Sequence, residues 1–277
     1  MKYLVLGSSG QIGAALAAWL RSCGETVIEF DMVNRPEEDL RIYANPYLDE
    51  CMTACDFVFF LAFDVGGSRY LKVYQETYEF LSNNARLMEF GFESIRRHKK
   101  PFIFASSQMA NMSYSSYGTL KAIGDHYVKS LNGLVVKFWN VYGIERDLSK
   151  SHVITDFILK ARDTKLIDMM TDGQESRQML YADDCSKCLH ILSKDYTNVS
   201  RDKPLHITNF EWTKVVHIAE LIAAEFPGSK IVPAKSTDEV QRDKRNDPDS
   251  FIFNYWKPET SVEEGIRRVA AYYREHV

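Results

Sequence analysis

Short apolar segments alternate with longer helical stretches along the first half of the chain. Strands as apolar as these, separated by helices, are typical of a parallel sheet that is covered on both faces. The pattern therefore predicts an α/β fold with a doubly wound parallel sheet. The expected strands are residues 2–7, 25–31, 56–62, 101–107 and 134–139, and the expected helices between them are residues 11–23, 70–97 and 115–131.

The second half of the chain is less regular, and it contains neither an internal repeat nor a low-complexity segment. We expect a domain boundary near Val141, although no linker marks it. Residues 1–140 then form the sheet domain, and residues 141–277 form a smaller α/β domain. In this half the expected helices are residues 153–161, 184–192, 213–225 and 261–275, the short strands are 205–208 and 230–232, and 242–249 is a charged loop.

A glycine-rich turn, Gly7-x-x-Gly10-x-x-Gly13, follows the first expected strand and opens the first helix. Glycines allow a tight turn and let a pyrophosphate approach the helix N-terminus, where free N–H groups and the helix dipole favour anions. Asp31 ends the second expected strand, where a carboxylate can accept hydrogen bonds from an adenosine ribose and would repel a 2′-phosphate. The pattern therefore predicts a dinucleotide cofactor and favours NAD over NADP.

Tyr117 and Lys121 are four positions apart, so they share one face of the expected helix 115–131. A free tyrosine titrates near pKa ~10, but a neighbouring ammonium stabilises the phenolate and lowers that pKa. Such a tyrosine can take a proton from an alcohol while a hydride leaves the same carbon. We therefore predict that Tyr117 and Lys121 form a catalytic pair.

Composition narrows the class of protein. The chain has 277 residues, of which 45% are hydrophobic, and a formal net charge of −4, so nothing indicates binding to nucleic acid or to anionic lipid. No apolar run approaches the ~20 residues that span a bilayer, and the apolar start of the chain is too short for a secretion signal. Five cysteines, an odd number, do not resemble a disulfide framework, so we expect a reducing cytoplasm. The pairs Cys51/Cys55 and Cys185/Cys188 are expected to be buried thiols rather than a metal site.

Further motifs extend over the rest of the chain: Ala105-Ser106-Ser107, the turn at 137–143, the segments 172–177 and 181–184, and the closing segment 255–265. Together with the glycine turn, they resemble the extended short-chain dehydrogenases/reductases of the nucleotide-sugar epimerase and dehydratase group. The resemblance covers nearly the whole chain. It implies a Rossmann-type NAD domain, a C-terminal substrate domain, and a return of the segment 181–196 to the first domain. It also implies a GDP-, UDP- or dTDP-linked sugar as the substrate.

The resemblance assigns roles to individual residues. It implies that Ser107 is the catalytic hydroxyl, which hydrogen-bonds the same sugar oxygen, beside Tyr117 as the base and Lys121 as its partner. The cofactor contacts that it implies are Gly7, Ser9, Gly10, Gln11, Ile12, Gly13, Asp31, Asp39, Leu40, Leu61, Ala62, Phe63, Asn83, Tyr117 and Lys121. The substrate contacts that it implies are Ser107, Gln108, Met109, Asn140 and Arg177, with Arg242 or Arg245 as a second arginine for a diphosphate. No metal ligand is implied.

Three features depart from the pattern of the resembled group. Gln108 and Met109 stand where related dehydratases carry an aspartate and a glutamate, and the 3,5-epimerases have a cysteine in place of Met109. Neither side chain can carry a proton to or from carbon. The connection from Ser107 to Tyr117 is shorter than usual, although ten residues still span up to ~33 Å. Ile144 replaces the proline that usually follows the Tyr142-Gly143 turn.

The function that we expect is NAD-dependent hydride transfer at C4 of a nucleotide-linked sugar, and most simply a 4-epimerase. The open alternatives are a 4-dehydrogenase or 4-keto-reductase on the same substrates and, less favoured, a 4,6-dehydratase, a 3,5-epimerase or a catalytically silent nucleotide-sugar-binding protein. The 3,5-epimerase alternative stays open because Asp64-Val65-Gly66-Gly67 resembles the GDP-mannose 3,5-epimerases. As in many members of the group, the helices 70–97 and 115–131 are expected to form the contact of a homodimer.

Overall fold

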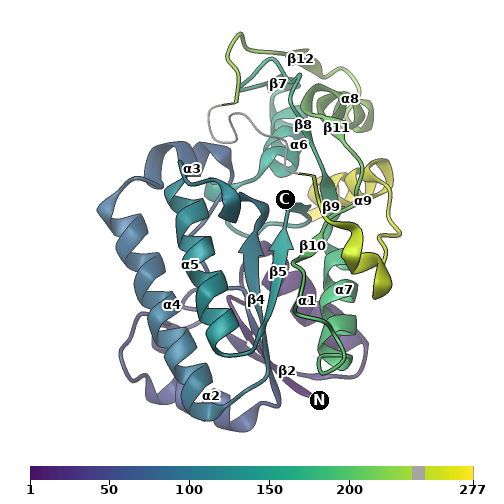
Figure 1. Ribbon diagram of the computed structural model, residues 1–277. Helices are drawn as coiled ribbons and strands as arrows, with labels where there is room; N and C mark the ends of the chain where they lie inside the picture. The colour runs from purple at the N-terminus through teal and green to yellow at the C-terminus, as the bar shows by residue number, and fades with distance from the viewer. Residues whose placement is uncertain (239–246, 277) are drawn as a thin grey trace.

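A six-stranded sheet forms the centre of the larger domain, and all of its neighbouring strands are parallel (Figure 1). This arrangement confirms the doubly wound parallel sheet that the sequence predicts. The computed structural model describes residues 1–238 and 247–276. In spatial order the strands are β10 (Leu205–Ile207), β5 (Leu134–Phe138), β4 (Phe102–Ser107), β3 (Phe57–Phe60), β1 (Lys2–Leu6) and β2 (Thr26–Phe30).

Helices cover both faces of this sheet because its strands are apolar on both sides. Along β1, Tyr3 and Val5 belong to one core cluster, whereas Leu4 and Leu6 belong to the other. The first cluster includes side chains of α1 and α7, which pack against each other. This packing supports the proposed return of residues 181–196 to the first domain. The helices are α1 (Gln11–Ser22) and α7 (Ala182–Lys194) on one face, and α2 (Pro46–Ala54), α4 (Tyr78–His98) and α5 (Ser116–Ser130) on the other.

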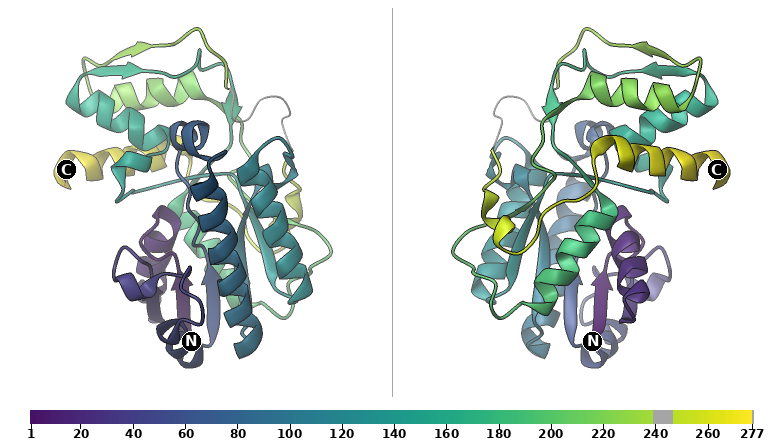
Figure 2. Two further views of the ribbon diagram at one scale, coloured as in Figure 1. Left: turned by 90° about the vertical axis from the view of Figure 1, so that its left-hand side faces the viewer. Right: turned by 90° about the vertical axis from the view of Figure 1, so that its right-hand side faces the viewer.

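A smaller group of elements lies beyond the carboxyl ends of the strands (Figure 2). Its core is a third apolar cluster, to which three helices contribute. Short two-stranded pairs complete it and connect it to the larger domain. The helices are α6 (Val153–Asp163), α8 (Val215–Glu225) and α9 (Val262–His276), and the pairs are β6 (Asn140–Tyr142) with β9 (Met179–Tyr181), β7 (Leu166–Asp168) with β12 (Lys230–Val232), and β8 (Ser176–Arg177) with β11 (Thr213–Lys214).

The structure differs from the expected elements in three places. The single helix expected at 70–97 is two helices, α3 (Ser68–Tyr74) and α4, because the Thr77 hydroxyl caps the second by accepting from the Phe80 N–H at 3.3 Å. Helix α2 was not expected, although Asn45 caps it and Pro46 opens it. The strand expected at 205–208 joins the large sheet as its edge strand β10.

Two further expectations concern the paired cysteines and the lack of a segment that could span a membrane. Cys51, Cys55, Cys185 and Cys188 are buried free thiols, and burial raises the pKa of Cys51 and Cys55 to about 11. Among the helices of residues 1–238 and 247–276, none is long and apolar enough to cross a membrane.

Candidate active site

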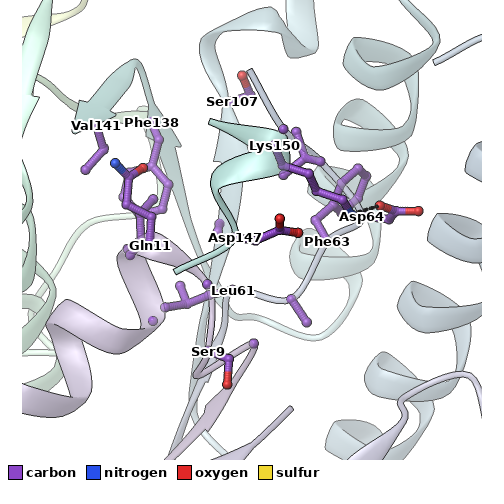
Figure 3. Close-up of a pocket in the computed structure, with 18 of the residues that line it drawn as sticks. Ser9, Gln11, Leu61, Phe63, Asp64, Ser107, Phe138, Val141, Asp147 and Lys150 are labelled. Atoms are coloured by element: carbon purple, nitrogen blue, oxygen red, sulfur yellow. Dashed lines mark hydrogen bonds and ion pairs between the residues drawn. The ribbon is translucent and has the colours of Figure 1, made fainter. Parts of the chain in front are cut away.

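A cavity of about 440 Å³ lies at the carboxyl ends of the parallel strands. Strand β2 lies on one side of β1, and β3, which follows β2 in the chain, lies on the other. The strand order therefore reverses at β1. Ligands of such sheets bind at this reversal of strand order. Residues at or just after the ends of five different strands border the cavity, and Figure 3 shows several of them around it, including Ser9, Leu61, Ser107 and Phe138.

The three glycines of the first turn meet different requirements. Gly7 has a φ of +86°, and a Cβ there would lie 2.6 Å from the Ala62 backbone nitrogen. A Cβ at Gly13 would lie 2.0 Å from the Gly7 carbonyl oxygen. Around Gly10, by contrast, the nearest atom to an added Cβ would be 3.5 Å away, so the fold itself tolerates a side chain there. Gly10 borders the cavity, where a missing side chain leaves room for a pyrophosphate at the start of α1. The turn therefore fits the diphosphate of NAD.

Two carboxylates border the cavity where β2 ends. Asp31 accepts hydrogen bonds from the backbone N–H groups of Ser9 and Val33, each at 3.0 Å. Glu38 is buried and accepts from the Asp31 backbone N–H at 2.8 Å. Their negative charge disfavours a 2′-phosphate at this end, in agreement with NAD rather than NADP. Sequence reasoning did not single out Glu38, because its burial depends on the fold of the 31–39 loop.

Arg41 connects two of the predicted cofactor residues. Its guanidinium pairs with Asp39 at 2.8 Å and donates to the Asn83 side-chain oxygen at 2.9 Å. Burial raises the pKa of Asp39, but its hydrogen bonds with Arg41 outweigh this, so that pKa lies below its usual value. The role of Arg41 could not be predicted from any motif in the sequence. The cavity is also lined by the other residues predicted to contact the cofactor: Gly7, Ser9, Gln11, Ile12, Gly13, Leu40, Leu61, Ala62 and Phe63.

Gln11 has a structural role beyond the one predicted for it. With its amide nitrogen toward the Val141 carbonyl at 3.1 Å and its amide oxygen toward the Gly143 N–H at 2.9 Å, the side chain donates to the first and accepts from the second. The first residue of α1 is therefore hydrogen-bonded to β6 and to the turn that follows it. This contact joins the glycine turn to the segment that leads into the smaller domain.

Ser107, Tyr117 and Lys121 come together on one wall of the cavity. Ser107 ends β4, and the other two lie on successive turns of α5. A Cβ at Gly118 would lie 2.3 Å from the Met109 carbonyl oxygen, so α5 packs directly against the turn after β4. This close approach lets the short connection place both Ser107 and Tyr117 at the cavity.

The Tyr117 phenol and the Lys121 amine have shifted pKa values in the protein alone. Burial raises the pKa of Tyr117 to about 12, and a hydrogen bond with Ser107 opposes this only partly. Burial lowers the pKa of Lys121 to about 7, against the charge of Asp125. The Lys121 amine donates to the Ala105 carbonyl at 2.6 Å and lies 3.7 Å from the centre of the Phe63 ring. The expectation that Lys121 lowers the pKa of Tyr117 is therefore wrong for the protein alone, because burial dominates.

Asp125 follows Lys121 by one further helical turn and was not predicted. Burial raises its pKa, whereas Ser106, Lys137 and Lys121 lower it. The Lys137 amine lies 3.6 Å from the Asp125 carboxylate and donates to the Asn111 side chain at 3.3 Å. The lysine of the predicted pair thus has a charged network behind it. The repeat of polar residues at 117, 121 and 125 was the available signal.

Gln108 and Met109 are buried in the short 3₁₀ turn Gln108–Asn111 that follows Ser107. The Met109 N–H donates to the Ser107 hydroxyl oxygen at 3.1 Å. Both residues border the cavity, and their contact with a substrate stays a prediction. Neither supplies a titratable group to it.

A second cavity, of about 150 Å³, lies between α3, α6 and β8. Arg69, Lys72 and Arg177 line it. Arg177 pairs with Asp238 and donates to the Ser176 carbonyl at 2.8 Å. The predicted Arg242 and Arg245 lie outside the described residues. Five residues line both cavities, which therefore adjoin each other: Gly67, Ser68, Asn140, Val141 and His152.

Asp64 and Lys150 join two loops across the edge of the first cavity (Figure 3). Their charged groups are 2.9 Å apart, and the Tyr70 hydroxyl donates to Asp64 at 2.7 Å. Burial raises the pKa of Asp64, but the bonds from Tyr70 and Lys150 outweigh it and leave that pKa below its usual value. A Cβ at Gly67 would lie 2.3 Å from the Ser151 carbonyl oxygen, so the two loops touch along their backbones.

Comparison with known proteins gives the fold and the cofactor a wider setting. A UDP-glucose 4-epimerase from Thermotoga maritima, solved with UDP-glucose, covers 99% of this chain and 99% of its own at a TM-score of 0.82 and 19% identity. A GDP-6-OMe-4-keto-L-xylo-heptose reductase from C. jejuni covers 100% of this chain and 98% of its own at a TM-score of 0.84 and 15% identity. At these identities the likeness concerns the fold.

Sequence relatives match a shorter stretch. The GDP-L-fucose synthase of Sinorhizobium fredii is 28% identical over 138 residues, which are 47% of this chain and 43% of that protein. The chain spans about half the length of the curated relatives that it matches. The model of the NAD dependent epimerase/dehydratase family matches residues 3–207, which include the glycine turn, Ser107, Tyr117 and Lys121. The chain therefore belongs to the NAD dependent epimerase/dehydratase family, and its cofactor is NAD.

Proposed function

We propose that this protein transfers a hydride at C4 of a nucleotide-diphosphate sugar and acts as a 4-epimerase. The observation that carries the proposal is the position of the Tyr117 phenol. It lies beside Ser107 and Lys121 in the cofactor cavity, and that cavity adjoins a second one lined by cations. A nucleotide in the second cavity would direct its sugar toward Tyr117.

The three polar residues divide the proton chemistry between them. Tyr117 takes the proton of the C4 hydroxyl, and Ser107 holds the same oxygen by a hydrogen bond. The cavity would hold NAD, which would supply the acceptor for the hydride that leaves C4. Lys121, whose pKa burial lowers to about 7, can carry or release a proton near neutral pH and contributes positive charge when protonated. A high pKa of Tyr117 in the protein alone implies that the phenol becomes an effective base only when positive charge adjoins it.

The turn after Ser107 argues against reactions that move a proton on carbon. Dehydration and 3,5-epimerisation each need an acid or base beside the sugar ring. Gln108 and Met109 occupy the cavity wall there, and neither can exchange a proton near neutral pH. We therefore propose chemistry confined to C4.

The occupant of the second cavity is proposed to be the nucleotide diphosphate. Arg69, Lys72 and Arg177 supply positive charge, and arginine suits a diphosphate because its planar fork donates two parallel hydrogen bonds. The names of the relatives include both UDP- and GDP-linked sugars, so the base stays open. A homodimer is also proposed, which sedimentation would measure. Exposed apolar side chains on α4 and α5 support it: Tyr78, Leu81, Ile123 and Tyr127.

A Tyr117→Phe variant tests the role of the phenol. We expect turnover of UDP- and GDP-sugars to fall by about 10³-fold or more, with NAD binding retained, because only the proton acceptor is lost. Tyr127→Phe is the matched control: Tyr127 lies on the same helix, and its ring stacks on Phe92 away from the cavity. Full activity in Tyr117→Phe would remove the proposed base.

A substrate deuterated at C4 separates the epimerase from its main alternative. A 4-epimerase returns the label to C4 of the product and releases no net NADH. A 4-dehydrogenase transfers the label to NADH in proportion to product. The reductase alternative has one observation in its favour, the extent of the fold likeness to a 4-keto sugar reductase.

A further inference from the structure

The border between the two cavities carries a histidine that the proposed mechanism does not use. His152 lines both cavities and immediately precedes the first residue of α6. A nucleotide sugar that extends from one cavity to the other must cross this border. The part of such a ligand that joins nucleoside to sugar is the diphosphate.

Glu145 holds His152 by two contacts. One Glu145 carboxylate oxygen accepts from the His152 backbone N–H at 3.0 Å, and the other lies 2.5 Å from Nδ1 of the ring. Burial raises the pKa of Glu145, but the contacts with His152 outweigh it, so that pKa lies below its usual value. A buried carboxylate that stays ionised places the Nδ1 proton on the side of Glu145.

Glu145 is itself fixed from behind. Its backbone N–H donates to the Tyr273 hydroxyl at 2.8 Å, and the same hydroxyl donates to the Glu145 carbonyl at 3.1 Å. Tyr273 belongs to the core of the smaller domain. The position of the His152 ring is therefore set by the folded core rather than by an exposed loop.

The other ring nitrogen of His152 is available to a ligand. Among residues 1–238 and 247–276, none hydrogen-bonds Nε2, and the His152 side chain is 39% exposed. By contrast, two cationic side chains near this border are already paired, Lys150 with Asp64 at 2.9 Å and Arg69 with Asp156 at 3.2 Å. A protonated imidazole at this border offers a donor and a positive charge together.

We propose that His152, held by Glu145, binds the diphosphate of the nucleotide sugar through Nε2 and makes substrate affinity depend on pH. The inference rests on the proposed function and adds a residue and a pH response to it. Binding tightens when the ring is protonated and weakens when it is neutral, because the diphosphate is an anion.

Other charged groups also face the two cavities. Carboxylates, lysines and arginines ordinarily titrate outside the range of about pH 6 to 8.5. Lys121 is an exception, since burial lowers its pKa to about 7. The contribution of His152 is therefore measured as the difference in the pH dependence of affinity between the unchanged protein and a His152 variant. The charged groups that line the two cavities are Asp31, Glu38, Asp39, Arg41, Asp64, Arg69, Lys72, Lys121, Glu145, Arg146, Asp147, Lys150, Asp156, Glu175, Arg177 and Asp238.

The test measures affinity of the NAD-loaded protein for UDP-glucose and GDP-mannose by calorimetry at about pH 6 and about pH 8.5. These probes are diphosphate diesters and lack the terminal phosphate that titrates near pKa ~6. We expect the unchanged protein to bind one of them about 10-fold more tightly at the lower pH. In His152→Asn this difference should shrink to less than about 2-fold, with affinity near that of the unchanged protein at the higher pH. Asparagine is a favoured residue before a helix, so α6 should still begin at Val153.

A matched control comes from the surface of α8. His217 also pairs with a glutamate, Glu220, at 3.1 Å, but its side chain is 50% exposed and borders neither cavity. His217→Asn should keep the affinity and the pH response of the unchanged protein. NAD affinity, measured in parallel, should be unaltered in both variants, which separates loss of the diphosphate contact from general damage.

Each outcome bears on the inference. Unaltered affinity and pH response in His152→Asn would overturn it while leaving the 4-epimerase in place. A fall in kcat with unchanged affinity would also overturn it, since His152 would then act on the chemistry. If His152→Asn melts well below the control, His152→Gln decides by the same measurements. If the unchanged protein binds neither these probes nor dTDP-glucose, the proposed function fails and the inference with it.

Discussion

The cofactor side and the proposed substrate side of this site are held together by different kinds of contact. Around the glycine turn the contacts run between backbones: the Gly7 N–H donates to the Phe30 carbonyl, and the Leu61 N–H to the Leu6 carbonyl, each at 2.9 Å. Around the second cavity they run between long charged side chains, such as Arg69 with Asp156 and Arg177 with Asp238. Backbone contacts leave little freedom, whereas partly exposed ion pairs add little stability and can exchange partners. One side is thus fixed by the fold, and the other can adapt to its ligand.

The sharpest way to break this comparison is a methyl group in the glycine turn. Gly13→Ala should cost at least about 3 kcal/mol in the free energy of unfolding, because its Cβ would lie 2.0 Å from the Gly7 carbonyl oxygen. Gly10→Ala should lower the free energy of unfolding by less than about 0.5 kcal/mol, because its Cβ would be in ordinary contact distance of the protein. It should still weaken NAD binding, because the added methyl group would occupy space that the pyrophosphate needs. Urea unfolding and NAD titration would measure the two effects. Equal stability of the two variants would contradict a turn fixed by backbone contact.

A second, intermediate effect follows from the buried amine of Lys121. Its pKa is about 7 in the folded protein and ordinarily ~10.4, so between these values the unfolded chain keeps a proton that the folded one releases. Stability must then rise with pH through this window, by about 2 kcal/mol between pH 7 and 9 at ~1.4 kcal/mol per unit. The rise should disappear in Lys121→Met. Parallel pH profiles of urea midpoints for the two proteins would show that Lys121 is not the source.

The smallest effect is expected on the substrate side. Arg177→Lys should weaken binding of a nucleotide sugar by about 10-fold, since lysine cannot offer the paired donors of arginine. The free energy of unfolding should change by less than about 1 kcal/mol, because lysine keeps the positive charge opposite Asp238 and leaves no unpaired carboxylate. Calorimetric titration with UDP- and GDP-sugars and an unfolding curve would compare these. A large loss of stability would instead place Arg177 among the structural residues.

What the sequence predicted follows the same division. The parallel strands and the glycine turn depend on local patterns: apolar runs, the spacing of Gly7, Gly10 and Gly13, and Asp31 at a strand end. These features were readable because short stretches of chain determine them. The family and the NAD cofactor followed from them and from Tyr117 with Lys121.

The parts that the sequence did not predict arise from distant segments. Glu38 and Arg41 border the cavity only because their loop folds back over β2 and meets Asn83. Glu145 acquires its role from Tyr273, more than a hundred positions away. The pKa of Tyr117 was predicted in the wrong direction, because adjacency to Lys121 was visible in the sequence and the depth of burial was not. Long-range packing, rather than local propensity, determines each of these properties.

The position of β10 at the edge of the large sheet has a consequence for synthesis of the chain. Strand β5 receives its outer neighbour only from Leu205–Ile207, about seventy positions later. Until those residues leave the ribosome, the N–H and C=O groups along one side of β5 have no strand to meet, and exposed apolar edges of this kind recruit other chains. Fragments that stop short of residue 205 should therefore aggregate, whereas fragments that include residue 207 can close the sheet.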